Sequence, residues 1–272
     1  MDWWQALVLG LVQGLTEFLP VSSSGHLVIF QHLTGTTVDP DSFVGFTVLV
    51  HFATVCSTLV VFWAAIWKLL KGLFKFRYND ETDYIAKLIV SMIPVAVVGL
   101  FFKDAVENLF GEGLIVVACC LLVTALLLWL SDLFGNRKGA REHRNGLSFA
   151  QAFVVGIGQA AAVAPGLSRS GTTIATGLLT GVRRDVMAQF SFLMVLVPIV
   201  GEQLLSVVKS VHGGEAMFGP DMSTLSLVLG FVAAFLAGLF ACKAMIALVR
   251  RAKLYWFSIY CVLAAVLCFF LQ

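Results

Sequence analysis

The chain has 272 residues, of which 59% are hydrophobic and only 12% are charged, and its mean hydropathy is +0.93. Soluble domains carry about 25% charged residues, so this composition excludes a soluble globular protein and indicates an integral membrane protein. The net charge of +2, with no basic cluster among exposed aromatics, argues against nucleic-acid binding. The six cysteines lie in apolar runs without Cys-x-x-Cys spacing and predict neither disulfides nor a metal site.

The chain begins with an apolar segment, about 3–35, that Pro, Ser and Gly interrupt midway. It has no basic start or cleavage site, so we expect no removable signal peptide. A second interrupted segment lies at about 149–181. Because unpaired backbone cannot face lipid, each is expected to be a re-entrant hairpin of two half-helices. About 20 apolar residues cross a bilayer. The sequence predicts six such transmembrane helices, at 43–67, 84–102, 113–132, 185–208, 224–249 and 254–271.

Charges in the connecting loops predict the orientation of the chain. The loops 68–83 and 133–148 and the turn near 250 are rich in Lys and Arg, whereas 103–112 is mainly acidic and 209–223 is mixed. The positive-inside rule places the three basic loops in the cytoplasm and both termini outside. The first hairpin then enters the membrane from outside and the second enters from the cytoplasm.

The two interrupted segments are also related in sequence. Residues 6–35 align without gaps on 152–181, with nine identities in thirty positions at a constant offset of 146. Each hairpin precedes three predicted spans, so the two copies are inverted. We therefore predict an all-α membrane domain, 1–272, with an inverted-topology repeat. Repeat A covers about 1–132 and repeat B about 149–272, joined by a cytoplasmic linker at about 133–148. In such folds the shared site lies where the two hairpin tips meet.

The tip of the second segment reads Ser168-Arg169-Ser170-Gly171-Thr172-Thr173 and precedes an expected half-helix at 173–179. A helix N-terminus offers free N–H groups and a positive dipole, which together bind anions. The planar guanidinium of Arg169 suits phosphate, and the hydroxyls of Ser168, Ser170 and Thr173 add donors. This pattern predicts a phosphate-binding site. The alternative is a capped helix whose arginine pairs with Glu17 and has no other role.

In the first segment, Gln13 and Glu17 are four residues apart and therefore share one helix face. Glu17 is a candidate ligand of a divalent cation or a candidate general base. With one carboxylate, such a cation would depend heavily on substrate phosphate oxygens.

The tip of the first segment carries Ser22, Ser23, Ser24 and His26. A serine with a nearby histidine is the pairing that activates a hydroxyl nucleophile, and His26 is alternatively a proton donor to a leaving phosphate. Serine caps and a hydrogen-bonded histidine are the structural alternatives. His51, within the span 43–67, ranks lower because an interhelical hydrogen bond explains it equally well.

These motifs resemble those of bacterial undecaprenyl-diphosphate phosphatases of the bacitracin-resistance type, and the resemblance covers essentially the whole chain. It rests on Gln13-xxx-Glu17 and on the runs 20–26 and 165–173. The resemblance implies hydrolysis of undecaprenyl diphosphate to undecaprenyl phosphate and inorganic phosphate, which recycles the lipid carrier for peptidoglycan synthesis. It also implies a divalent cation, Mg²⁺ or Ca²⁺, and a site in the bacterial inner membrane that faces the periplasm.

The resemblance further implies roles for single residues. Arg169, Glu17 and His26 would be required, Ser23 would be the nucleophile, and Ser168 and Thr173 would bind phosphate. The first acidic position of the family is Glu or Gln, and here it is Gln13, which weakens a metal site built on two carboxylates. Two other classes are considered: an inverted-repeat transporter or flippase of a phosphorylated lipid, and a protein that only sequesters such a lipid. The sequence leaves open whether a homodimer forms.

Overall fold

The computed structural model describes residues 1–102, 113–135, 143–213, 222–251 and 253–271. Within these ranges the chain consists of α-helices and one short 3-10 helix, without strands, so the predicted all-α class is confirmed. The loop 103–112, much of the linker 133–148 and most of the loop 209–223 lie outside the described residues. The orientation predicted from the charges of these loops therefore stays a prediction.

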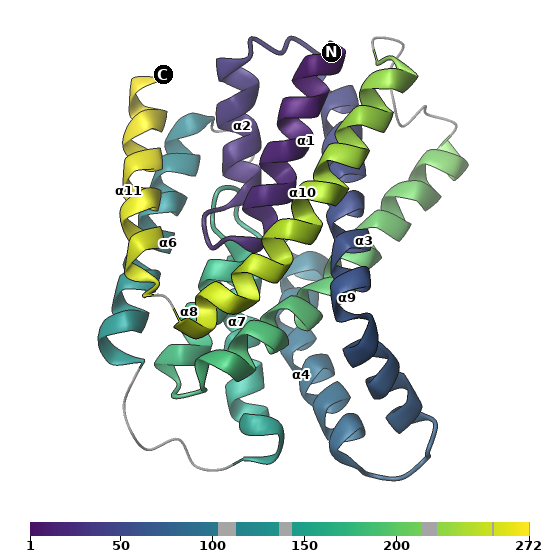
Figure 1. The fold of residues 1–272 in the computed structure, drawn as a ribbon, viewed down its shortest axis with the longest axis vertical. Helices are drawn as coiled ribbons and strands as arrows, with labels where there is room; N and C mark the ends of the chain where they lie inside the picture. Colours follow the sequence, from purple (N-terminus) through teal and green to yellow (C-terminus); the bar gives the residue numbers. More distant parts are fainter. Residues whose placement is uncertain (103–112, 136–142, 214–221, 252, 272) are drawn as a thin grey trace.

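The first interrupted segment is a hairpin of α1 (Trp3–Phe18) and α2 (Ser23–Leu33). The chain leaves α1 at Leu19-Pro20, where the proline disfavours a helical conformation for the residue before it. Ser22 caps α2, because its Oγ accepts a hydrogen bond from the backbone N–H of Gly25 at 3.2 Å. Figure 1 shows α1 and α2 lying side by side, with the connecting turn near the middle of the molecule.

The second interrupted segment follows the 3-10 helix η1 (Arg144–Gly146) and is a hairpin of α7 (Phe149–Ala161) and α8 (Arg169–Leu179). Its second helix begins at Arg169, four residues before the expected start at 173. The reason is the cap at Ser168, whose Oγ accepts from the N–H of Gly171 at 3.1 Å. Arg169 therefore lies in the first turn of the helix and not in a loop before it.

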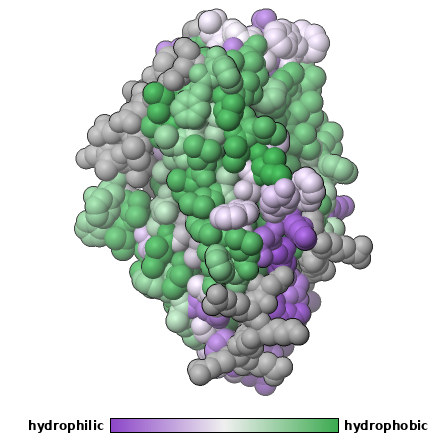
Figure 2. All heavy atoms as spheres, turned by 90° about the vertical axis from the view of Figure 1, so that its left-hand side faces the viewer, coloured by the Kyte–Doolittle hydropathy of each residue, from purple (hydrophilic) through white to green (hydrophobic). Residues whose placement is uncertain are grey.

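The longer helices match the predicted spans in position. Five are long and apolar enough to cross a membrane: α3 (Pro40–Leu73), α4 (Asp80–Phe101), α6 (Leu114–Phe134), α9 (Arg184–Gly213) and α10 (Thr224–Arg251). The sixth predicted span corresponds to α11 (Tyr255–Phe270), an apolar helix of 16 residues. At 1.5 Å per residue it is about 24 Å long, shorter than a typical hydrocarbon core. Figure 2 shows a broad hydrophobic surface with hydrophilic residues toward the ends.

Glycines allow the first helix of each hairpin to pack closely on a long helix. A Cβ on Gly10 of α1 would lie 2.3 Å from the carbonyl oxygen of Gly230 in α10. A Cβ on Gly156 of α7 would likewise lie 2.3 Å from the carbonyl oxygen of Ser91 in α4. These contacts fix both hairpins against the bundle. In Figure 1, α1 and α2 extend toward the end that holds both termini, and α7 lies toward the opposite end.

Candidate active site

The tips of the two hairpins are in direct contact at the centre of the molecule. Ser170 Oγ, in the first turn of α8, donates a hydrogen bond to the carbonyl oxygen of Leu19 at 3.0 Å. In the other direction, the backbone N–H of Gly166 donates to Ser24 Oγ at 3.4 Å. The two tips are therefore bonded to each other although they are far apart in the sequence.

Glu17, at the end of α1, is held by neighbours from three parts of the chain. Its Oε2 accepts hydrogen bonds from Gln13 Nε2 at 2.9 Å and from Ser23 Oγ at 2.6 Å. His51 Nε2 of α3 lies 3.5 Å from the same oxygen. The Glu17 side chain is only 8% exposed. These contacts hold the carboxylate in one orientation, next to the hydroxyl of Ser23.

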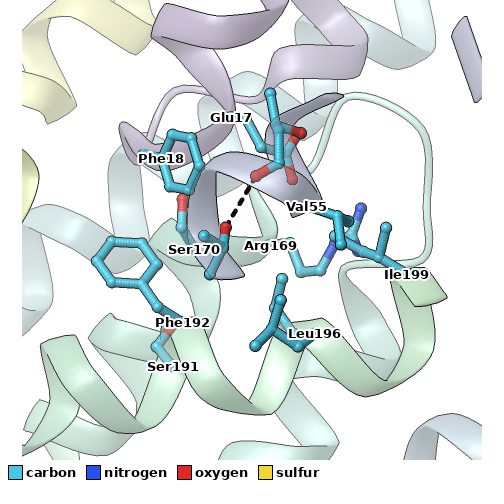
Figure 3. Close-up of a pocket in the computed structure, with 12 residues that line it drawn as sticks. Glu17, Phe18, Val55, Arg169, Ser170, Ser191, Phe192, Leu196 and Ile199 are labelled. Carbon is cyan, nitrogen blue, oxygen red and sulfur yellow. Dashed lines mark hydrogen bonds between the residues drawn. The ribbon is translucent and has the colours of Figure 1, made fainter. Parts of the chain in front are cut away.

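Arg169 lines the same pocket as Glu17, between α1, α3, α8 and α9. Figure 3 shows the two side chains reaching the pocket from different elements, with Ser170 beside them. Within the residues that the structure describes, Glu17 and Arg169 form no ion pair within 4.0 Å, and the Arg169 side chain donates no hydrogen bond to the protein. A half-buried guanidinium without a protein partner retains its donors for an anionic ligand.

The remaining lining of the pocket is partly polar and partly apolar. Thr54 and Thr58 of α3 and Ser191 of α9 supply hydroxyl groups. The apolar wall consists of Phe18, Val55, Phe192, Val195, Leu196 and Ile199. A pocket that combines a cation, a carboxylate and hydrocarbon walls fits an amphiphile with an anionic head.

The other predicted phosphate ligands of α8 mostly hold the helix in place. The backbone N–H of Ser168 donates to Thr124 Oγ1 of α6 at 3.1 Å, and Thr173 Oγ1 lies 2.6 Å from Ser191 Oγ. A Cβ on Gly171 would lie 3.1 Å from the side chain of Ser168. Thr172 is buried, and its hydroxyl has no hydrogen-bond partner among the described residues. Among the predicted phosphate-binding residues 168–173, Arg169 and Ser170 are the two that line the pocket.

A serine–histidine pairing requires that the imidazole of His26 contact a serine hydroxyl, but neither ring nitrogen of His26 does so among the described residues. Its Nδ1 lies 2.7 Å from the carbonyl oxygen of Ser22, and its Nε2 lies 2.8 Å from the hydroxyl of Tyr260 in α11. The Ser22 and Ser24 hydroxyls lie 3.4 Å from each other. The basic group beside Ser23 is therefore the carboxylate of Glu17 and not an imidazole.

Sequence reasoning undervalued the face of α3 that lines the site. His51 contacts Glu17, and Thr54 and Thr58 line the pocket. The carbonyl oxygen of Thr47 accepts from His51 Nδ1 at 2.8 Å and so orients the ring. The spacing 47, 51, 54, 58 follows one face of a helix, and this polar periodicity within an apolar span is the signal that could have identified the face.

The oxygen donors beside Glu17 suit a hard divalent cation only in part. Among the described residues there is no group of three His, Cys, Asp or Glu side chains that could hold a metal. Gln13 Oε1, however, is buried without a hydrogen-bond partner in that part of the chain, and it belongs to the same side chain that donates to Glu17. A carboxylate and an amide oxygen fit Mg²⁺ or Ca²⁺ if water and substrate complete the coordination.

Together these features define an all-α, multi-spanning membrane protein in which two helical hairpins meet at a pocket lined by a carboxylate and a guanidinium. The family model described as bacitracin resistance protein BacA matches residues 6–267, so the chain belongs to the BacA family. The chain is 52% identical to the undecaprenyl-diphosphatase of Bacteroides thetaiotaomicron over 264 residues, which cover 97% of each protein. It is 37% identical to the undecaprenyl-diphosphatase of Carboxydothermus hydrogenoformans over 260 residues, 96% of this chain and 94% of the relative.

Proposed function

We propose that this protein is a membrane phosphatase that hydrolyses undecaprenyl diphosphate to undecaprenyl phosphate and inorganic phosphate. The observation that carries the proposal is the Arg169 guanidinium, which has no protein partner among the described residues and shares a pocket with Glu17. The names of the relatives at 52% identity point to the same activity. The product is the lipid carrier needed for further rounds of peptidoglycan synthesis.

In this proposal each group of the pocket has one task. The Arg169 guanidinium binds the terminal phosphate, and Ser170 lies beside it. The apolar residues of α9 contact the first part of the prenyl chain. Phosphoryl transfer depends mainly on positioning and charge neutralisation, so Arg169 contributes most.

Glu17 accepts the proton of Ser23 as Ser23 Oγ attacks the terminal phosphorus, from its present hydrogen bond of 2.6 Å. The bond from phosphorus to the bridging oxygen breaks, and undecaprenyl phosphate leaves. Water then hydrolyses the phosphoserine and releases inorganic phosphate. A divalent cation held by Glu17 and Gln13 would neutralise phosphate charge. If water attacks directly, rapid quenching with labelled substrate yields no phosphoserine.

The proposal includes the membrane topology: six transmembrane helices, with α11 as the shortest, and two re-entrant hairpins in inverted repeats. Hydrogen bonds that recur at the offset of 146 support it. Gln5 Nε2 donates to the carbonyl oxygen of Thr34 at 3.2 Å, and Gln151 Nε2 donates to that of Thr180 at 2.9 Å. With the basic loops in the cytoplasm, the pocket opens toward the periplasm of the inner membrane.

The test is phosphate release by purified protein in detergent, where an enzyme turns over, whereas a transporter or a sequestering protein does not. Removing an arginine that stabilises a phosphoryl-transfer transition state costs about 10³–10⁵-fold in rate, so Arg169→Ala is expected to lose most activity. The matched control is Arg183→Ala, because Arg183 is exposed and pairs with Asp185. Near wild-type turnover by Arg169→Ala contradicts the proposal.

A further inference from the structure

The turn that presents Ser23 is held in an unusual backbone conformation. Ser22 has φ 69° and ψ 96°, in the left-handed region that residues other than glycine rarely adopt. Such a conformation is strained and persists only where its surroundings over-determine it. Here the carbonyl oxygen of Ser22 accepts two hydrogen bonds from His26, from the backbone N–H at 3.2 Å and from Nδ1 at 2.7 Å. The next residue, Ser23, then reaches Glu17.

The hydrogen bonds also fix the tautomer of His26. A carbonyl oxygen only accepts, so Nδ1 must carry the proton. In the neutral ring Nε2 then accepts from the hydroxyl of Tyr260 at 2.8 Å. The two rings are stacked, with centroids 5.5 Å apart and an interplanar angle of 9°. The opposite tautomer would direct a lone pair at the Ser22 carbonyl oxygen, so this carbonyl selects the Nδ1–H form, and the Tyr260 hydroxyl holds the ring by donating to Nε2.

Both ring nitrogens of His26 have protein partners. His26 is 3% exposed and does not belong to the residues that line the pocket. Tyr260 lies on α11 and is 45% exposed on the apolar outer surface, where its hydroxyl requires a partner. The imidazole supplies that partner.

We infer that His26 and Tyr260 are positioning residues for the proposed phosphatase, on which this inference rests. Tyr260 fixes the His26 ring, His26 holds the strained carbonyl of Ser22, and this carbonyl sets the direction of Ser23 toward Glu17. His26 transfers no proton to the substrate. A histidine that is required for activity would thus act through hydrogen bonding to the backbone.

Substitutions of His26 separate hydrogen bonding to the Ser22 carbonyl from proton transfer to the substrate. The side-chain N–H₂ of asparagine occupies nearly the position of Nδ1, whereas that of glutamine occupies nearly the position of Nε2. With undecaprenyl diphosphate in detergent, His26→Asn is expected to stay within about tenfold of wild-type kcat, with an unchanged pH profile. His26→Gln and His26→Ala should fall at least tenfold below His26→Asn. A general acid contributes about 10²–10⁴-fold, so a proton donor would make all three variants equally inactive.

Tyr260→Phe provides an independent test, with Tyr255→Phe on the same helix as its control. The first should lower kcat about tenfold with KM little changed, and the second should change neither. If His26→Asn does not fold, as judged by its thermal transition, Tyr260→Phe decides, and an unchanged kcat overturns the inference. If wild-type protein is active and a folded His26→Asn has a kcat no higher than that of His26→Gln, the inference is also overturned. Inactive wild-type protein overturns the proposed function and the inference together.

Discussion

A buried ion pair outside the active site fixes the entry of the second hairpin. Lys87 Nζ of α4 lies 2.5 Å from Asp83 Oδ2 and donates to the carbonyl oxygen of Arg144 at 2.6 Å. The two side chains are only 3% and 4% exposed. Asp83 also accepts from Tyr78 and from Asn145 Nδ2. The pair thus ties α4 to the 3-10 helix that precedes α7.

Lys87→Met retains the volume of the side chain, but it leaves the Asp83 carboxylate without its cationic partner and the Arg144 carbonyl oxygen without its Lys87 donor. Removing one partner of a buried ion pair costs about 3–5 kcal/mol of unfolding free energy. At roughly 2–4 °C per kcal/mol, the thermal midpoint in detergent should fall by about 6–20 °C. Thermal unfolding of the purified variant measures this shift. The double variant Asp83→Leu with Lys87→Met removes the unpaired charge and should recover part of the loss.

Lys68→Met is the matched control for this experiment. Lys68 lies 3.8 Å from Glu81, but its side chain is 77% exposed. Exposed pairs contribute about 0–1 kcal/mol, so the control midpoint should move by a few degrees at most. Equal midpoints for Lys87→Met and Lys68→Met would refute the claim that the Asp83–Lys87 pair stabilises this end of the molecule.

Three further predictions concern the site and its support. Ser23→Ala should abolish both phosphate release and any phosphoserine trapped by rapid quenching, and full turnover would exclude Ser23 as the nucleophile. His51→Gln should retain more activity than His51→Leu, because only the amide can donate to Glu17; equal kcat values would show that this contact has no role. Gly156→Ala should destabilise the protein by more than about 1 kcal/mol, whereas Gly99→Ala, whose Cβ meets no atom within 4 Å, should be neutral or stabilising, and equal melting midpoints would contradict this.

The sequence predicted the helical elements well because their signals are local. Long apolar runs identified the positions of the longer helices, and Pro, Ser and Gly marked both breaks between the paired shorter helices. The spacing of Gln13 and Glu17 placed them on one helix face, and in the structure the two side chains are hydrogen-bonded on that face. The start of α8 was placed too late. Residues 169–172 have the composition of a loop and were therefore predicted to precede the helix. Because Ser168 is the N-cap, Arg169 is instead the first residue of the helix.

The partners of His26 and Glu17 could not be predicted in the same way. His26 precedes Tyr260 by 234 residues, and His51 reaches Glu17 from another helix. Because His26 and the serines are close together in the chain, the sequence suggested that the imidazole contacts a serine hydroxyl. In the structure the His26 ring instead faces Tyr260 of α11. The position of a residue along a helix gives its face, but only the packing of the other helices gives what that face meets.

The sequence by itself determined that this is a helical membrane protein with two interrupted segments of similar sequence, and that an acid and an arginine lie at the interruptions. Hydropathy, helix caps and internal similarity are properties of short segments, which is why they can be read from the chain. Only the tertiary structure decided that Ser23 faces Glu17, that Arg169 has no protein partner in the described residues and that His26 faces Tyr260. These contacts depend on how separate helices pack, and packing is a property of the whole fold.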